Sequence, residues 1–170
     1  MELGATEGKL RTVGVEALAI VITPVERARL YFRYRPTRVA VLADPDVTAH
    51  RAFSLPRFEL TDAEGAMSDW PFRTTREAFF AVRTNAKGEL PESLPLVEAG
   101  AALDQKDAFE LTEVDHEVRA KHWNQLAGYF IIDRDGVIRW THVEAEHGVA
   151  DYGKSPSNEE ILAVARALVQ

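Results

Sequence analysis

Two short apolar runs separated by a helix-forming segment constrain the fold of this chain most strongly. The first run covers residues 15–22 and stops at Thr23, and the second covers residues 39–43 and stops at Asp44. Short apolar runs bounded by turn signals are typical of strands buried on both faces of a parallel sheet. We therefore predict a β-α-β-α unit whose two strands are neighbours and buried.

Helix starts are marked by capping boxes, in which a Ser or Thr hydroxyl accepts a backbone N–H and a Glu three residues later returns the bond. Three pairs have this spacing: Thr23 and Glu26, Thr74 and Glu77, and Ser157 and Glu160. We predict helices over residues 24–35, after Thr74 and after Ser157. Asp44 is expected to cap a further short helix that ends near Phe53.

The centre of the chain is less regular than its two ends. Residues 54–127 contain several prolines and glycines and no long apolar periodicity, so we expect an irregular insertion that covers the sheet or forms a lid. Two strand-forming runs then flank the turn residues Asp135 and Gly136, which predicts an antiparallel hairpin. The predicted order is β-α-β-α, insertion, β-hairpin and C-terminal helix in one α/β domain over residues 1–170.

This order is that of a thioredoxin-like fold, and specific residues strengthen the likeness. The segments concerned are residues 18–21, 42–46, 49–53, 55–56 and 128–140. They resemble, in the same order, the redoxin group of the alkyl hydroperoxide reductase and thiol-specific antioxidant family, especially its peroxiredoxin-like branch. The resemblance covers most of the chain except the insertion, and it implies a sheet whose parallel half comes first.

The chain departs from that family where the family performs its chemistry. The family carries a catalytic cysteine in a turn at the start of its first helix, whereas this chain has no cysteine. Residues 1–10 resemble the latter part of that helix, so the resemblance implies an N-terminally truncated fold whose first strand and catalytic turn lie before Met1. No catalytic or cofactor-binding residue carries over. Disulfides, thiolate metal sites and cysteine nucleophiles are excluded as well.

A missing first strand would have a physical consequence for the sheet. In the complete fold that strand pairs beside residues 15–22, so its loss would expose an apolar edge with unpaired backbone groups. We expect the N-terminal segment, the insertion or a second copy of the chain to cover this edge. A homo-oligomer through the exposed sheet edge is therefore the expected assembly, with another protein as the alternative partner.

Charge and hydropathy limit the other partners. The net charge is −7 at pH 7, which argues against non-specific nucleic-acid binding. No apolar run approaches the roughly 20 residues that span a bilayer, and the N-terminus lacks the pattern of a secretory signal. We expect a cytoplasmic protein that binds neither nucleic acid nor membrane.

The densest group of metal-ligand residues follows the second hairpin strand. Its members are His142, Glu144, Glu146 and His147. Residues two apart share one face of a strand, so the first three would align and His147 would fold in from the loop. Imidazole with carboxylates suits zinc or manganese, and such a metal can ionise water for hydrolysis. The alternative interpretation, a solvated acidic strand end, is favoured because the spacing is no established signature.

Arginines and aromatic residues are concentrated over residues 27–38. We expect these arginines to face solvent and to pair with the acidic C-terminal part of the chain, within one copy or between copies. In the alternative, Arg29 and Arg33 share a helix face and hold a phosphate or carboxylate. His50 is expected to be a surface or packing residue.

These observations favour a thiol-less thioredoxin-like, peroxiredoxin-like domain without cysteine peroxidase or disulfide reductase activity. It would act as a binding or scaffold module, or represent a redoxin fragment. The alternative is a metal-assisted hydrolase that uses the His/Glu cluster at 142–147, so the sequence does not decide whether the chain is an enzyme. Antioxidant behaviour through Met1 and Met67 is a weaker alternative, since methionine oxidation is not catalytic without a reductase.

Overall fold

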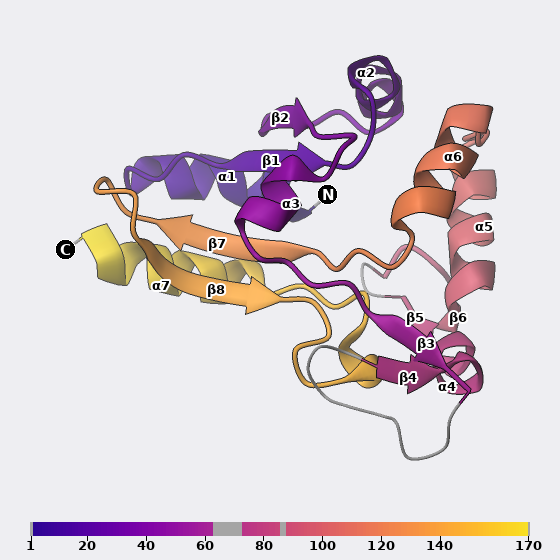
Figure 1. Cartoon of the computed structure of the whole chain (residues 1–170). Helices are drawn as coiled ribbons and strands as arrows, with labels where there is room; N and C mark the ends of the chain where they lie inside the picture. The colour runs from indigo at the N-terminus through magenta and orange to yellow at the C-terminus, as the bar shows by residue number, and fades with distance from the viewer. Residues whose placement is uncertain (1, 63–72, 86–87, 170) are drawn as a thin grey trace.

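The computed structural model describes residues 2–62, 73–85 and 88–169, with side chains described from Thr6 onward, as a mixed α/β structure (Figure 1). Met1 and Met67 lie outside the described residues. No helix in the described ranges has both the length and the apolar character needed to cross a bilayer. In chain order the elements are α1 (Glu2–Thr12), β1 (Leu18–Val21), α2 (Val25–Tyr34), β2 (Ala40–Ala43), α3 (Thr48–Ala52), β3 (Glu59–Thr61), β4 (Arg73–Thr75), α4 (Arg76–Ala81), β5 (Arg83–Thr84), β6 (Leu94–Pro95), α5 (Leu96–Lys106), α6 (Glu113–His122), β7 (Gly128–Ile132), β8 (Ile138–Val143), the 3-10 turn η1 (Val149–Asp151) and α7 (Asn158–Val169).

The N-terminal half contains the predicted parallel pair. Strands β1 and β2 run in the same direction, with Ala19 opposite Val41 and Ile20 opposite Leu42, and α2 connects them. The Asp44 carboxylate accepts the N–H groups of Thr48 (2.9 Å) and Ala49 (2.8 Å), as expected for a residue that caps α3. The predicted β-α-β-α order is therefore confirmed.

The C-terminal half contains the predicted hairpin. Strands β7 and β8 are antiparallel, and their register shifts between Ile131 and Ile132, where a bulge interrupts the ladder. The turn is held by the Asp133 carboxylate, which accepts the N–H groups of Asp135 and Val137, both at 2.9 Å. Gly136 has a φ of 79°, a conformation that side chains disfavour, so the Asp-Gly signal marks the turn correctly.

The prediction that both early strands are buried is wrong. No residue of β1 or β2 is fully buried, and Leu18 and Leu42 are each 52% exposed. The physical reason is that, in the described part of the chain, β1 pairs only with β2 and β7 only with β8. Strands with the composition of a sheet interior therefore stand at the edges of two separate two-stranded sheets.

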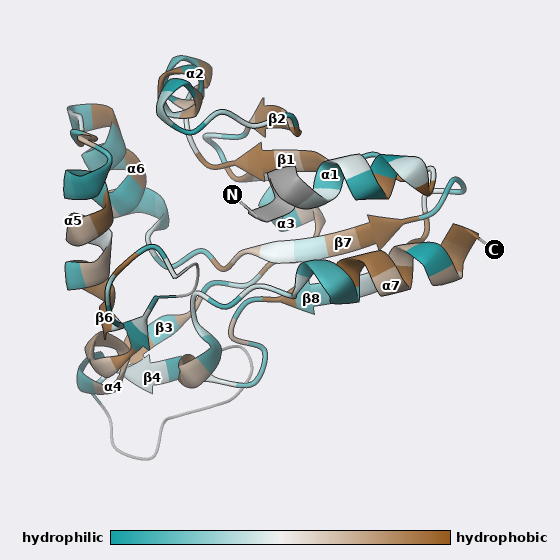
Figure 2. Ribbon diagram, turned by 180° about the vertical axis from the view of Figure 1, so that it is seen from behind, coloured by the Kyte–Doolittle hydropathy of each residue, from teal (hydrophilic) through white to brown (hydrophobic). Residues whose placement is uncertain are grey.

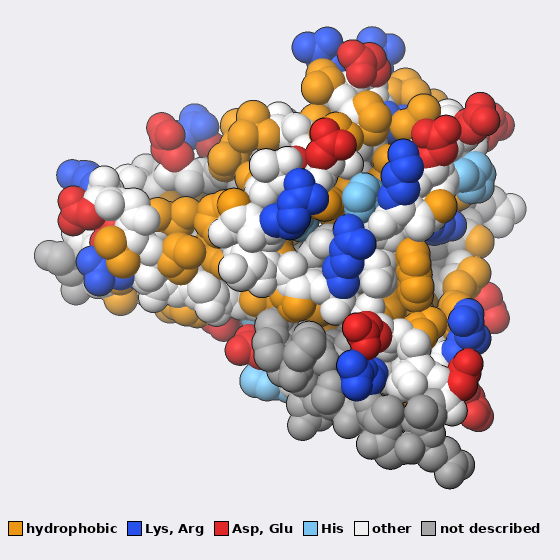
Figure 3. All heavy atoms as spheres, viewed as in Figure 1, with side chains coloured by type: hydrophobic (Ala, Val, Ile, Leu, Met, Phe, Trp, Pro, Cys, Tyr) orange, Lys and Arg blue, Asp and Glu red, His pale blue; other side chains and the backbone are white. Residues whose placement is uncertain are grey.

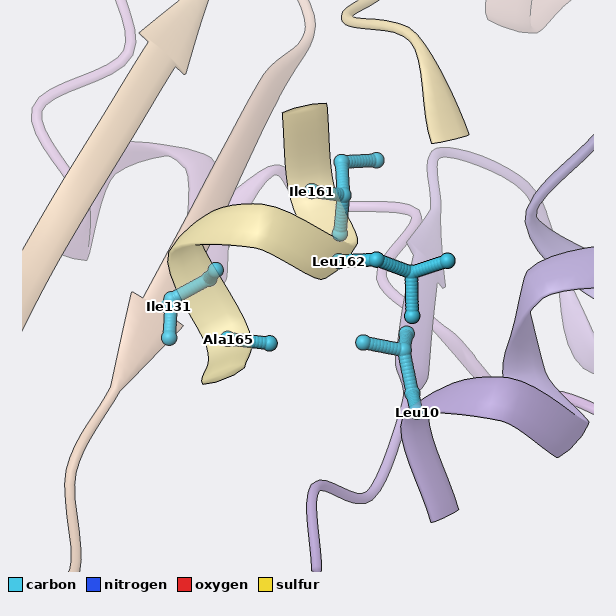
Figure 4. Close-up of a cluster of buried hydrophobic side chains, with 5 residues drawn as sticks. All are labelled: Leu10, Ile131, Ile161, Leu162 and Ala165. Carbon is cyan, nitrogen blue, oxygen red and sulfur yellow. The ribbon is translucent and has the colours of Figure 1, made fainter. Parts of the chain in front are cut away.

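Helices α1 and α7 pack together on one side of β7 and form the first hydrophobic core (Figures 2 and 4). Figure 2 shows apolar residues along β1, β7 and one side of α7. The Ser157 hydroxyl oxygen accepts the Glu160 N–H at 3.1 Å, which confirms the predicted start of α7. The core consists of Leu10, Ile131, Ile161, Leu162 and Ala165.

The middle of the chain is more regular than its sequence predicts. It contains α5 and α6, short strand pairs, and α4, whose N-terminal N–H groups are capped by Thr75 rather than Thr74. The Thr75 hydroxyl oxygen accepts the Ala78 N–H at 3.1 Å. This part is built around a second core made of Phe58, Phe79, Leu126 and Ala145.

Helix α2 and the residue after it are joined to the middle of the chain by buried and half-buried ion pairs, which differ from the expected solvent-facing arginines. Arg27 is only 8% exposed, and its guanidinium bonds the Asp115 carboxylate (2.7 Å) and the Glu110 carbonyl (3.0 Å). Arg35 binds both Glu89 and Asp107. The expected pairing with acidic residues of the later chain is thus confirmed within one copy.

The capping box predicted at Thr23 is not formed. Pro24 is the N-cap residue, and no side chain caps α2.

Candidate functional site: a cleft between two strand edges

A cleft of about 550 Å³ lies between β1 and β7. Every residue of both strands lines it, so its two walls are Leu18–Val21 and Gly128–Ile132. In Figure 1 these two strands run in opposite directions and face each other across the centre of the molecule. Because neither strand has another pairing partner on this side among the described residues, two strand edges face one space.

Helices close the two faces of the cleft. In Figures 1 and 2, α3 lies on one side of the β1–β7 gap, and α1 and α7 lie on the other. From the α3 side, Phe53 reaches the cleft and its ring lies 4.7 Å from that of Phe130, centroid to centroid. From the opposite side come Leu10 and Ile161, members of the first core. The cleft is therefore mainly apolar on both faces as well as along its walls.

Polar groups also lie at the cleft, and one pair is formed by the Tyr129 hydroxyl, which donates to the Ser155 hydroxyl at 2.9 Å. His50 also lines the cleft, and its Nδ1 atom is 3.5 Å from the Asp44 carboxylate, so the predicted packing residue is part of the candidate site. Burial of Asp44 favours its neutral form, but the N–H groups of Thr48 and Ala49 and the His50 ring outweigh this and lower the pKa of the carboxyl group. Among the described residues that line the cleft, Glu16 is the acidic one and none is Lys or Arg.

A side chain at residue 128 would displace its neighbours at the cleft. A Cβ atom on Gly128 would lie 2.5 Å from the Leu55 side chain and 2.9 Å from the Phe130 ring. Such contacts are far shorter than van der Waals distances. The small residue lets the segment around Leu55 close one end of the cleft against the start of β7.

The outer end of the cleft opens to a hydrophobic surface. Leu18 and Ile132 line the cleft and are 52% and 45% exposed. Figure 3 shows hydrophobic side chains gathered on this face over β7. An exposed apolar surface that continues into a cleft of this kind is typical of an interaction site.

The predicted metal ligands are placed differently from the expected row on one strand. Strand β8 ends at Val143 and Ala145 has a φ of 56°, so His142, Glu144 and Glu146 do not alternate along one strand. His142 stacks on Trp140 with 6.3 Å between the ring centroids. Within the described ranges, no group of three or more His, Asp or Glu side chains is arranged to hold a metal ion.

Glu144 has a structural role that the sequence does not reveal. Its carboxylate accepts the N–H groups of Ala127 (3.1 Å) and Gly153 (2.8 Å), which ties the loop after β8 to the start of β7. Burial raises the pKa of Glu144, and burial together with the Glu144 charge raises the pKa of Tyr152 to about 12. Zinc or manganese binding by His142, Glu144, Glu146 and His147 stays a prediction, which elemental analysis of the purified protein tests.

The exposed apolar edge beside residues 15–22 is the part of this site that the sequence predicts. The second wall is not predicted, because it lies more than 100 residues away in the chain. Phe53 and Trp140, which also line the cleft, carry no local signal of it. Comparison with protein families, with curated proteins and with solved structures finds no match for this chain.

Proposed function

We propose that this chain is a thiol-less thioredoxin-like domain that acts as a binding module, and that the cleft between β1 and β7 binds an extended polypeptide segment. The observation that carries the proposal is a pair of strand edges that have no pairing partner within the described ranges and that face each other across a mainly apolar space of about 550 Å³. Unpaired backbone N–H and C=O groups at a sheet edge bind another extended backbone.

The order of the elements supports the thioredoxin-like assignment. A parallel β1-α2-β2 unit comes first, and an antiparallel β7–β8 hairpin with a C-terminal helix comes last, as the redoxin resemblance implies. The cleft lies beside β1, where the first strand of that fold would pair. With no cysteine in the chain, the proposed activity is recognition rather than peroxide or disulfide chemistry.

The lining indicates the chemistry of the partner. A small polar metabolite would leave most of this apolar wall without complementary contacts. A folded second copy would have to bring its own edge between two strands that already face each other. A single strand with apolar side chains fits both the main-chain edges and the lining. It requires no negative charge in its centre, because no described Lys or Arg lines the cleft.

The test uses an array of capped peptides whose four-residue cores are drawn from Val, Ile, Leu and Phe, with flanking lysines for solubility. Binding to the purified protein is followed by fluorescence anisotropy of the labelled peptides. We expect a subset to bind, and we expect Leu18→Lys to weaken that binding about tenfold or more by placing a charge at the cleft. Leu18 is 52% exposed, so the substitution is compatible with folding.

A matched control lies on the neighbouring strand. Leu42 is also 52% exposed but does not line the cleft, so Leu42→Lys is expected to bind peptides like the unchanged protein. On the second wall, Ile132→Lys and Ile138→Lys form an equivalent pair, since these residues face each other across the hairpin at 45% and 44% exposure. Absence of binding by every peptide, or equal loss in the test and control variants, would contradict the proposed function.

A further inference from the structure

We infer that the bound segment becomes a central strand that pairs with β1 and β7 at once and joins the two sheets into one, in the order β2-β1-segment-β7-β8. This inference rests on the proposed function and goes further, because peptides often bind a sheet through one edge only. It follows from the direction in which the backbone groups of both walls point.

On β1, the backbone groups of Leu18 and Ile20 point to the cleft. The Val21 carbonyl accepts the Asp44 N–H at 2.8 Å, so the backbone groups of Val21 face β2. Successive residues of a strand direct their N–H and C=O groups to opposite sides, so Ala19 also faces β2 while Leu18 and Ile20 face away from it. These two residues therefore present the free edge of this wall.

On β7, the same alternation directs the backbone groups of Gly128 and Phe130 to the free edge of the strand. The Ala127 carbonyl accepts the Glu144 N–H at 2.9 Å, so Ala127, and with it Tyr129 and Ile131, face β8. Gly128 and Phe130 then direct their N–H and C=O groups toward the cleft. Both walls thus present donors and acceptors at every second residue, which is what a strand between them requires.

The directions of the walls add a geometric condition. Because β1 and β7 run in opposite directions, a segment between them is parallel to one wall and antiparallel to the other, whichever way it enters (Figure 1). Its alternate N–H groups point to β1 and to β7 in turn. Both faces of the segment meet apolar side chains, from α3 on one side and from Leu10 and Ile161 on the other. A ligand apolar at consecutive positions fits this site better than one that alternates apolar and polar residues.

The experiment removes the N–H groups of one edge of the ligand at a time. The best peptide of the array is prepared in two further forms, N-methylated at core positions one and three, or at positions two and four. If the segment pairs with both strands, each N-methylated form should bind with an affinity lower by about tenfold or more, because each set of N–H groups bonds to one wall. Pairing with both strands also predicts that the unmodified peptide slows amide hydrogen exchange at both Ile20 and Phe130.

The outcomes separate this inference from the proposed function. If one N-methylated form binds like the parent peptide, or if only one of the two amides becomes protected, the segment pairs with a single wall and the inference is wrong while the binding function stands. If the parent peptides do not bind at all, both fail. Protection at Ile20 and Phe130 that survives Leu42→Lys but is lost in Leu18→Lys supports the central strand.

Discussion

At the scale of single residues, Gly128 is constrained by the side chains that surround it. We expect Gly128→Ala to destabilise the protein by about 1–2 kcal/mol, because the new methyl group must displace the Leu55 side chain from a contact of 2.5 Å. Urea unfolding followed by circular dichroism measures the change.

The control for this prediction is a glycine without neighbours. Gly8 lies in α1, and a Cβ atom there would meet nothing within 4 Å. Gly8→Ala should raise the free energy of unfolding by about 0.5–1 kcal/mol, because alanine favours the helix. If both alanine variants changed stability in the same direction, the close approach at Gly128 would not be the cause.

A second residue-scale prediction concerns pH. The hydrogen bond from Arg35 lowers the pKa of Glu89 below its ordinary value of 4.5. A depressed pKa in the folded state means that the pair stabilises the fold above about pH 4.5 and loses this contribution as the pH falls through the lowered value. We expect Glu89→Gln to lower the free energy of unfolding by about 1 kcal/mol at neutral pH. At a pH where the Glu89 carboxyl group is protonated, the substitution should leave the free energy of unfolding unchanged.

Urea midpoints measured from neutral pH down to about pH 3 test this difference. Glu92→Gln serves as the control, since Glu92 is an exposed acid three residues further along the chain. If the urea midpoints of Glu89→Gln and of the unchanged protein differed by the same amount at every pH, the ion pair would not be the source of the pH dependence.

At the scale of elements, the attachment of α2 to α6 depends on a largely buried ion pair. Arg27 is 8% exposed, and its guanidinium also lies over the Phe109 ring, 4.5 Å from the centroid. Removing one partner of such a pair leaves the other buried without compensation. We expect Asp115→Asn to lower the free energy of unfolding by about 3 kcal/mol.

Chemical denaturation measures this loss, with Glu113→Gln, an exposed acid of the same helix, as the control. The double variant Arg27→Met, Asp115→Leu should recover part of the stability, because no charge is then left unpaired. A double variant as unstable as the two single changes added together would contradict the argument.

Elements that could be predicted from the sequence are those with a strong local signal. The apolar runs at β1 and β2 and the Asp-Gly turn of the hairpin place four strands correctly. Helix α5 has no such signal, because it follows Pro95 and no side chain caps its first turn. Helix α6 has a local signal, since Thr112 and Asp115, which form its capping box, have the three-residue spacing of such boxes.

The candidate site illustrates why tertiary features are harder to predict. The composition of β1 indicates a buried strand, and this prediction fails because the cleft leaves one of its edges uncovered. The second wall is a contact between segments far apart in the chain, which local patterns do not record. The predicted metal ligands do not lie along one strand, because β8 ends at Val143 and Ala145 adopts a positive φ two residues later.

At the scale of the whole molecule, ligand binding should act on both halves of the fold. A peptide that binds only the folded state raises the free energy of unfolding by about 2.7 kcal/mol at a hundredfold excess over its dissociation constant. We expect this gain in thermal or urea unfolding of the unchanged protein and of Leu42→Lys, and its loss in Leu18→Lys. A gain of equal size in Leu18→Lys would place the peptide elsewhere.

The assembly state is a separate question at this scale. A homo-oligomer through the sheet edge stays a prediction, and size-exclusion chromatography with light scattering tests it. In this structure the free edge of β1 faces β7 across the cleft, so a second copy could pair with it only by entering or opening that space. A dimer that dissociates when peptide is added would indicate that copies and peptides compete for the same edge.

Strand length limits how much of a bound segment the proposed site can pair. Strand β1 is four residues long. Opposite it, the β7–β8 ladder is regular from Gly128 to Ile131, and its register then shifts because β8 carries one extra residue, Arg139. If a segment binds in the cleft as proposed, about four of its residues, roughly 13 Å of extended chain, would pair with β1, and a longer strand would extend beyond this wall.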